Sequence, residues 1–158
     1  IELLLKKNGV DFFNDKAVVK DPHNVLLEKG NSLLEAKNIV LANGSEPSMF
    51  PPFSKVEGMW TSNDVFKLAE MPSSLAIVGG GVIGVEFATF FSTFGVKTTI
   101  VELADHILPY EDTDVAEEIR KVLKKKGVTI LEKTKVVSVE KLDKGYLLNT
   151  TGDEEITI

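Results

Sequence analysis

A glycine-rich segment in the middle of the chain constrains the fold more than any other feature. Gly79–Gly84 follows the apolar run Leu75–Val78 and precedes a stretch whose apolar residues recur at helical spacing. Gly95 ends that stretch, and Lys97–Glu102, rich in β-branched residues, comes next. A strand, a tight turn, a helix and a second strand within about 30 residues are typical of a βαβ unit with parallel strands. The chain is therefore predicted to have an α/β fold.

Two helices are expected in this region, each with one buried stripe. The helix after the glycines is predicted to bury Ile83, Phe87, Phe90, Phe91 and Phe94. A second helix is expected to begin after the candidate N-cap residues Asp112, Thr113 and Asp114 and to stop at Gly127. Its predicted buried stripe consists of Val115, Ile119, Val122 and Leu123.

Short strands are predicted on both sides of the helices. Thr129–Leu131 is expected as a further strand, followed by an antiparallel meander of Val136–Val139, Tyr146–Leu148 and Ile156–Ile158. Near the N-terminus the expected strands are Val10–Phe13, Ala17–Val19, Asn24–Glu28, Ser32–Ala36 and Ile39–Ala42. The segment Lys29–Asn31 suits a hairpin connection because it contains glycine.

A proline-rich segment separates these two groups of strands. Pro47, Pro51 and Pro52 lie close together, and no hydrophobic period is visible around them. A short helix is expected to begin at Thr61 or Ser62 and to end before Pro72. The predicted organisation is a partial first domain over residues 1–50, a linker over 51–72 and a second domain over 73–158.

Composition narrows the possible functions. The 158 residues include 18 Lys and Arg against 24 Asp and Glu, a net charge of −6, which is the wrong sign for a general binder of nucleic acid. The chain contains no cysteine, which excludes disulfides, thiolate metal sites and cysteine nucleophiles from these residues. The apolar runs are too short for a bilayer span, and Ile1–Lys7 does not read as a secretory signal. We expect no metal site, no membrane association and a cytoplasmic location.

The glycine pattern and the acidic end of the next strand together predict a dinucleotide site. Gly79 permits a tight turn, Gly81 lets the backbone approach a pyrophosphate, and Gly84 lets the helix lie close to the strand. The phosphates would lie at the helix N-terminus, where free N–H groups favour anions. Glu102 would accept hydrogen bonds from the adenosine ribose, and Leu103–Leu108 offers no Lys or Arg for a 2′-phosphate. The sequence therefore favours NAD over NADP.

With these residues in place, the chain resembles the FAD- and NAD(P)-dependent disulfide oxidoreductases, most closely the dihydrolipoamide dehydrogenases. Besides Gly79–Glu86, the resemblance is carried by Asn38–Pro47, which looks like the family's ATGS-x-P segment, by Ile107–Pro109 and by Lys124–Val128. It covers nearly the whole chain but about the middle third of the family's length. It implies a Rossmann-like NAD-binding domain with a parallel sheet and an antiparallel meander, preceded by a β-rich remnant of an FAD-binding domain.

The resemblance also implies roles for individual residues. The residues that would hold the NAD pyrophosphate are Gly79, Gly80, Gly81, Val82, Ile83 and Gly84. Glu86 would lie near the nicotinamide, Glu102 would hold the ribose, and Val136 would flank the adenine side. Asn43, Gly44 and Ser45 would touch FAD, although the family usually has Thr at the position of Asn43.

The family's FAD-binding GxGxxG, its CxxxxC disulfide and its C-terminal His-Glu pair have no counterpart in these residues. We therefore assign no catalytic residue and expect this chain alone to be inactive. The complete enzyme would pass electrons from dihydrolipoamide through a disulfide and a flavin to NAD, as a homodimer that meets lipoyl-bearing complex subunits. Three alternatives remain: a stand-alone dinucleotide-binding module, a family member acting on glutathione, mercuric ion or peroxide, and a self-contained dehydrogenase.

Overall fold

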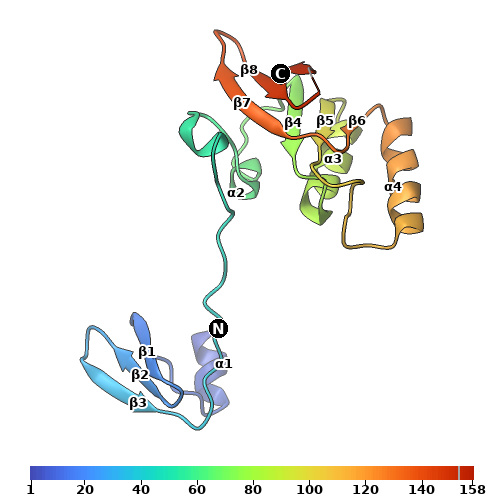
Figure 1. Cartoon of the computed structure of the whole chain (residues 1–158). Coiled ribbons are helices and arrows are strands. Elements are labelled where there is room, and N and C mark those ends of the chain that lie inside the picture. The colour runs from blue at the N-terminus through green and yellow to red at the C-terminus, as the bar shows by residue number, and fades with distance from the viewer. Residues whose placement is uncertain (153) are drawn as a thin grey trace. The chain divides into compact units, whose positions relative to one another are not determined.

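The computed structural model describes residues 1–152 and 154–158. The chain divides into two compact units, residues 1–45 and residues 46–158, and each is described by itself. Figure 1 labels the helices and strands used below.

The first unit is a small antiparallel sheet with one short helix. Its elements are α1 (Glu2–Lys7), β1 (Ala17–Asp21), β2 (Asn24–Leu27) and β3 (Ser32–Glu35). The strand order is β1-β2-β3, and Val25 pairs with both Val19 and Leu34. The predicted hairpin between β2 and β3 is therefore confirmed, with Asn31 in the left-handed region at φ +44°.

Two predicted strands of the first unit are wrong. Val10–Phe13 and Ile39–Ala42 are irregular, and Val40 and Leu41 are 85% and 74% exposed. A strand needs partners on a sheet to be stable, and neither segment pairs with another strand in the part of the chain described here. The sequence analysis also missed α1, whose first turn carries Glu2 and whose last turn carries Lys6 and Lys7, charges that suit the helix dipole.

The second unit is built around a parallel sheet. Its elements are the 3₁₀ turn η1 (Phe53–Lys55), α2 (Ser62–Val65), β4 (Ser74–Val78), α3 (Val82–Thr93), β5 (Lys97–Val101), α4 (Thr113–Lys125), β6 (Thr129–Leu131), β7 (Val136–Lys141), β8 (Tyr146–Thr150) and β9 (Glu155–Thr157). The parallel order is β4-β5-β6, and Ile77, Ile100 and Ile130 are aligned across it. Strands β7, β8 and β9 form a separate antiparallel sheet. Both predicted sheets of this unit are confirmed.

The two faces of the parallel sheet pack against different layers. Ile77, Ile100 and Ile130 belong to a cluster with residues of α3 and α4, including Ala88 and Leu123. Their neighbours Ala76, Val101 and Leu131 belong to a second cluster with Val139 and Leu148 of the antiparallel sheet. Because successive side chains of a strand point to opposite faces, the parallel sheet lies between a helix layer and a meander layer.

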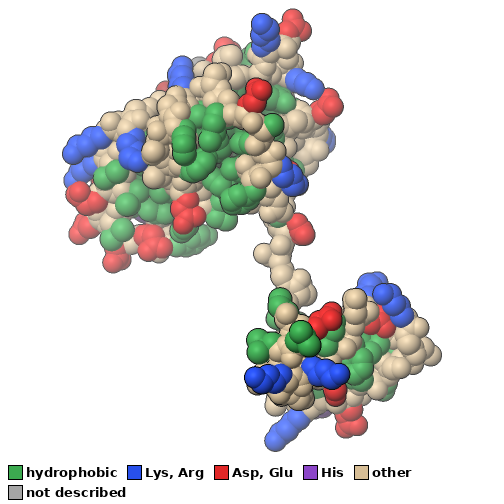
Figure 2. Space-filling model, turned by 180° about the vertical axis from the view of Figure 1, so that it is seen from behind, with side chains coloured by type: hydrophobic (Ala, Val, Ile, Leu, Met, Phe, Trp, Pro, Cys, Tyr) green, Lys and Arg blue, Asp and Glu red, His purple; other side chains and the backbone are tan. Residues whose placement is uncertain are grey.

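The predicted buried stripes of the two long helices are partly wrong. In α3 the buried residues are Gly84, Val85, Ala88 and Phe91, whereas Ile83, Phe90 and Phe94 are between 43% and 62% exposed. In α4 the buried residues are Ala116 and Leu123, and about half of Val115 and of Val122 is exposed. In α3 the small residues Gly84 and Ala88 lie on the buried side together with Val85 and Phe91, and they let the helix approach the sheet closely. Figure 2 shows apolar side chains gathered on one face of the larger unit.

Among the residues that the structure describes, no helix is long and apolar enough to cross a membrane. The same residues contain no group of three or more His, Asp or Glu side chains arranged to hold a metal ion.

Candidate functional site

The glycine-rich turn joins the end of β4 to the start of α3. Gly79 has φ +108°, a conformation that residues with a side chain rarely adopt, and its N–H donates to the carbonyl oxygen of Val101 at 2.9 Å. A methyl group on Gly84 would overlap the carbonyl oxygen of Gly79, so only glycine allows α3 to lie this close to the turn. A methyl group on Gly81 would meet nothing within 4 Å. Gly81 therefore borders open space, which leaves its backbone accessible to a ligand.

The start of α3 presents its backbone donors beside that open space. Gly81 is the N-cap residue, and its carbonyl oxygen accepts a hydrogen bond from the N–H of Val85 at 3.0 Å. The N–H groups before Val85 have no partner within the helix, which is general for helix N-termini. Such groups, together with the helix dipole, favour a phosphate without any lysine.

Glu102 lies directly beside the glycine turn, as the sequence predicts. It follows β5, its residue is 8% exposed, and its Oε2 accepts a hydrogen bond from the N–H of Gly80 at 2.6 Å. Its Oε1 accepts a second hydrogen bond from the N–H of Ala104 at 2.6 Å. A carboxylate has about four acceptor sites, so two backbone donors leave capacity for two hydroxyl groups. Glu102 can thus order the turn and bind a ribose at the same time.

A second contact holds Gly80 from the other side. Its carbonyl oxygen accepts a hydrogen bond from the N–H of Leu108 at 2.7 Å, and Ile107 packs against its Cα side, where a Cβ would lie 2.8 Å from Ile107 Cγ2. Both backbone polar groups of Gly80 are therefore fixed by the segment that follows β5. The sequence analysis missed Ala104, Ile107 and Leu108 because backbone donors and a packed methyl group leave no residue-type signature.

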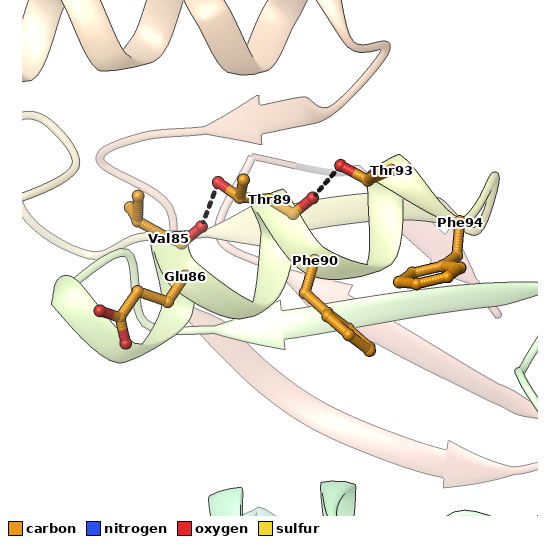
Figure 3. A pocket seen from close by; sticks show the side chains of 6 residues that line it. All are labelled: Val85, Glu86, Thr89, Phe90, Thr93 and Phe94. Atoms are coloured by element: carbon orange, nitrogen blue, oxygen red, sulfur yellow. Dashed lines mark hydrogen bonds between the residues drawn. The ribbon is translucent and has the colours of Figure 1, made fainter.

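Glu86 lies on the exposed side of α3, near its N-terminus. It lines a shallow hollow along the helix with Val85, Thr89, Phe90, Thr93 and Phe94. Figure 3 shows Glu86, Phe90 and Phe94 projecting from one side of α3, while the hydroxyl groups of Thr89 and Thr93 donate to the backbone of the preceding turn. The hollow combines one carboxylate with apolar rings.

The remaining predicted site residues lie elsewhere. Val136 is 4% exposed and packs with Val101, Val139 and Leu148, so its side chain is part of the core under the meander. Asn43, Gly44 and Ser45 belong to the first unit, where they form an exposed loop with Gly44 at φ +75°. Their contact with FAD and the contact of Val136 with adenine remain predictions.

Comparison with known proteins places the chain in a family. The family model of pyridine nucleotide-disulphide oxidoreductases matches residues 1–158. A dihydrolipoyl dehydrogenase of Acholeplasma laidlawii is 42% identical over 146 residues, which cover 89% of this chain and 43% of the relative. A dihydrolipoyl dehydrogenase of Bacillus subtilis is 37% identical over 147 residues, which cover 85% of this chain and 31% of the relative. The chain thus spans less than half of the length of these relatives.

Solved structures agree with the sequence comparison. The HOCl-induced flavoprotein disulfide reductase RclA of Escherichia coli is 29% identical and superposes with a TM-score of 0.76 over 99% of this chain and 38% of its own. A pyridine nucleotide-disulfide family oxidoreductase of Enterococcus faecalis, 22% identical, shares the fold with a TM-score of 0.79 over 99% of this chain and 39% of its own. With the glycine turn, the buried Glu102 and the matches over the whole chain, this protein belongs to the pyridine nucleotide-disulphide oxidoreductase family.

Proposed function

We propose that this chain is the NAD-binding portion of a flavin-dependent disulfide oxidoreductase of the dihydrolipoamide dehydrogenase type. The observation that carries the proposal is the position of Glu102, whose carboxylate is buried against Gly80, the residue before Gly81, where a Cβ would meet open space. In this arrangement the N–H groups at the start of α3 would hold the pyrophosphate and Glu102 would hold the adenosine ribose. Bound NAD would supply the hydride acceptor of the complete enzyme.

The choice of NAD over NADP follows from charge. A 2′-phosphate on the ribose would meet the carboxylate of Glu102, and like charges in a buried site repel strongly. The loop after Glu102 contributes Asp105 and His106 but neither Lys nor Arg, and the neighbouring Lys133 has its Nζ 3.4 Å from Oδ1 of Asp105, so the loop itself offers no permanent cation to a phosphate. We infer that NADH binds more tightly than NADPH.

The rest of the proposed activity comes from relatives whose names identify them as dihydrolipoyl dehydrogenases. In the complete protein, oxidation of a dihydrolipoyl group would be coupled to reduction of NAD through FAD, in a dimer that serves lipoyl-bearing complexes. Asn43, Gly44 and Ser45 would contact FAD there. In the first unit they line an exposed loop, so this contact is supported by the resemblance of the segment and by the retained turn at Gly44.

Calorimetric titration of the chain with NADH, NADPH and ADP-ribose tests the proposal. We expect saturable binding of NADH and ADP-ribose and weaker binding of NADPH. A folded chain that binds none of the three at millimolar concentration would contradict the dinucleotide site. Equal affinity for NADH and NADPH would contradict only the argument from Glu102.

A further inference from the structure

The ion pair between Glu132 and Arg120 is connected to the glycine turn through hydrogen bonds to the backbone of the loop that follows β5. Glu132 directly follows β6, and its side chain is 13% exposed. Its Oε1 accepts a hydrogen bond from the N–H of Ile107 at 3.1 Å, and its Oε2 lies 3.1 Å from the Nη2 atom of Arg120 in α4. The next N–H along the chain, that of Leu108, donates to the carbonyl oxygen of Gly80.

Arg120 is held in turn by its own helix. Its Nη1 atom lies 2.9 Å from Oε1 of Glu117, three residues earlier in α4, and its side chain is 31% exposed. The guanidinium group therefore bridges two carboxylates, and the one that it shares with the loop is the more buried of the two. A charged acceptor that is partly removed from water makes a stronger hydrogen bond to a backbone N–H than a neutral one does.

The carboxylate of Glu132 has two partners, whereas an ion pair that only joined α4 to the sheet would have one. One oxygen is paired with the cation, and the other is committed to the backbone of the segment that fixes Gly80. Leu108 has φ +53°, an unusual conformation for a residue with a branched side chain, so this segment needs contacts that hold it in place. Glu132 supplies such a contact at the preceding residue.

We propose that Glu132, oriented by Arg120, is a positioning residue of the dinucleotide site. It holds the backbone of Ile107 so that the N–H of Leu108 fixes the carbonyl of Gly80, and thereby sets the direction of the donors at the start of α3. The inference rests on the proposed function, because it assigns a task to residues that would not touch the nucleotide.

Four variants of the full chain test this inference. Glu132→Ala removes the acceptor and the charge, whereas Glu132→Gln keeps a carbonyl oxygen for Ile107 and loses the charge. Glu118→Ala and Glu118→Gln are the matched controls, because Glu118 forms an exposed ion pair with Lys121 in the same helix, at 2.7 Å, away from the loop. The readouts are the Kd for NADH, the thermal midpoint, and the amide exchange rates of Ile107, Leu108 and Gly80 measured by NMR.

We expect Glu132→Ala to raise the Kd for NADH, by about tenfold at most, the limit at which the whole loss of one hydrogen bond to a charged group is felt in binding, and Glu132→Gln to raise it by about threefold at most. Amide exchange at Ile107 and Leu108 should quicken in the same order, while both Glu118 variants should match the unsubstituted chain. If Glu132→Ala does not fold, the Kd for NADH and the amide exchange rates of Glu132→Gln are compared with those of Glu118→Gln, and this comparison tests the positioning role.

Several results would overturn the inference. One is a Glu132→Ala or Glu132→Gln variant with a lowered thermal midpoint but an unchanged Kd, which would make Glu132 a purely structural link. Another is a loss of affinity for NADH that is as large in Glu132→Gln as in Glu132→Ala. A third is an equal loss of affinity in the Glu118 controls. Failure of the unsubstituted chain to bind NADH would refute the proposed function. Unchanged amide exchange rates of Ile107 and Leu108 in both Glu132 variants would refute the positioning role alone.

Discussion

Replacing Gly81 with alanine should weaken dinucleotide binding at least about tenfold without destabilising the fold. The backbone at Gly81 has φ −69° and ψ −175°, a conformation open to any residue, and the added methyl group would meet no protein atom within 4 Å. At such a site alanine restricts the unfolded chain and stabilises by about 0.4–1 kcal/mol. Alanine is also a poorer N-cap than glycine by about 0.5–1 kcal/mol. The two effects nearly cancel.

The same methyl group would project into the space where, in the proposed site, the pyrophosphate would approach the backbone. Displacing the phosphate from one backbone donor removes a charge-assisted hydrogen bond, a loss of about 1.5–3 kcal/mol. The Kd for NADH should therefore rise at least about tenfold, since 1.4 kcal/mol is a factor of ten. Calorimetry with NADH gives the Kd, and far-ultraviolet circular dichroism gives the thermal midpoint, which should stay within about 3 °C of the parent value.

Two other glycines of the turn, Gly84 and Gly79, provide the controls. Gly84→Ala would force the new methyl group against Gly79, an overpacking that costs about 1–3 kcal/mol of folding free energy. Gly79→Ala would hold alanine at φ +108°, at a cost of about 1–3 kcal/mol. Both should lower the thermal midpoint, unlike Gly81→Ala. A Gly81→Ala variant that keeps the parent midpoint and binds NADH within twofold of the parent would refute this account of the turn.

Three further substitutions test two residues of the candidate site and the N-terminal cap of α2. Glu102→Arg should weaken NADH binding at least about tenfold, because the N–H groups of Gly80 and Ala104 lose their acceptor. The same change should raise the affinity for NADPH relative to NADH. An unchanged ratio of the two affinities, measured by calorimetry, would contradict the argument from charge. Glu86→Ala should leave the Kd for ADP-ribose unchanged and raise the Kd for NADH, since only NADH carries the nicotinamide. Equal effects on both ligands would show that Glu86 does not lie near the nicotinamide. The backbone N–H of Thr61 and its hydroxyl group donate to Asp64, which lowers the pKa of that carboxyl below its ordinary value of 3.8. The stabilisation by Asp64 is therefore present above pH 3.8 and lost as the pH falls through the lowered pKa. The difference in thermal midpoint between Asp64→Asn and the parent should shrink on acidification, and a constant difference would contradict this origin.

Local patterns in the sequence were sufficient for the βαβ unit and the meander. The glycine turn, the β-branched run that ends in Glu102 and the stop residues Gly95 and Gly127 act within a few residues, so the sequence contains the information that determines them. Because Val78 pairs with Val101 in the parallel sheet, the residues that follow the two strands, Gly80 and Glu102, come close together. Within the candidate site, the nearness of Glu102 to the glycine turn was predictable, whereas the contacts made by Ala104, Ile107 and Leu108 were not.

The errors arose where distant parts of the chain decide the outcome. Helix α3 is apolar around most of its circumference, so spacing alone cannot choose which side meets the sheet. The side with Gly84 and Ala88 does so because it allows the closest approach. Ile39–Ala42 has the composition of a strand but no partner among the described residues. The link from Arg120 through Glu132 to Ile107 joins three segments that no sequence period relates.

If Glu102 holds the ribose as proposed, its hydrogen bonds to Gly80 and Ala104 have an evolutionary consequence. A lineage that changed its dinucleotide preference by replacing Glu102 would in the same step deprive Gly80 and Ala104 of their hydrogen-bond acceptor. A variant with the new preference would survive only if another side chain had first taken over those two donors. Selection for a different cofactor would therefore have to pass through an intermediate in which a second side chain already accepts the hydrogen bonds of Gly80 and Ala104. Until such an intermediate arises, the ancestral cofactor preference would be retained.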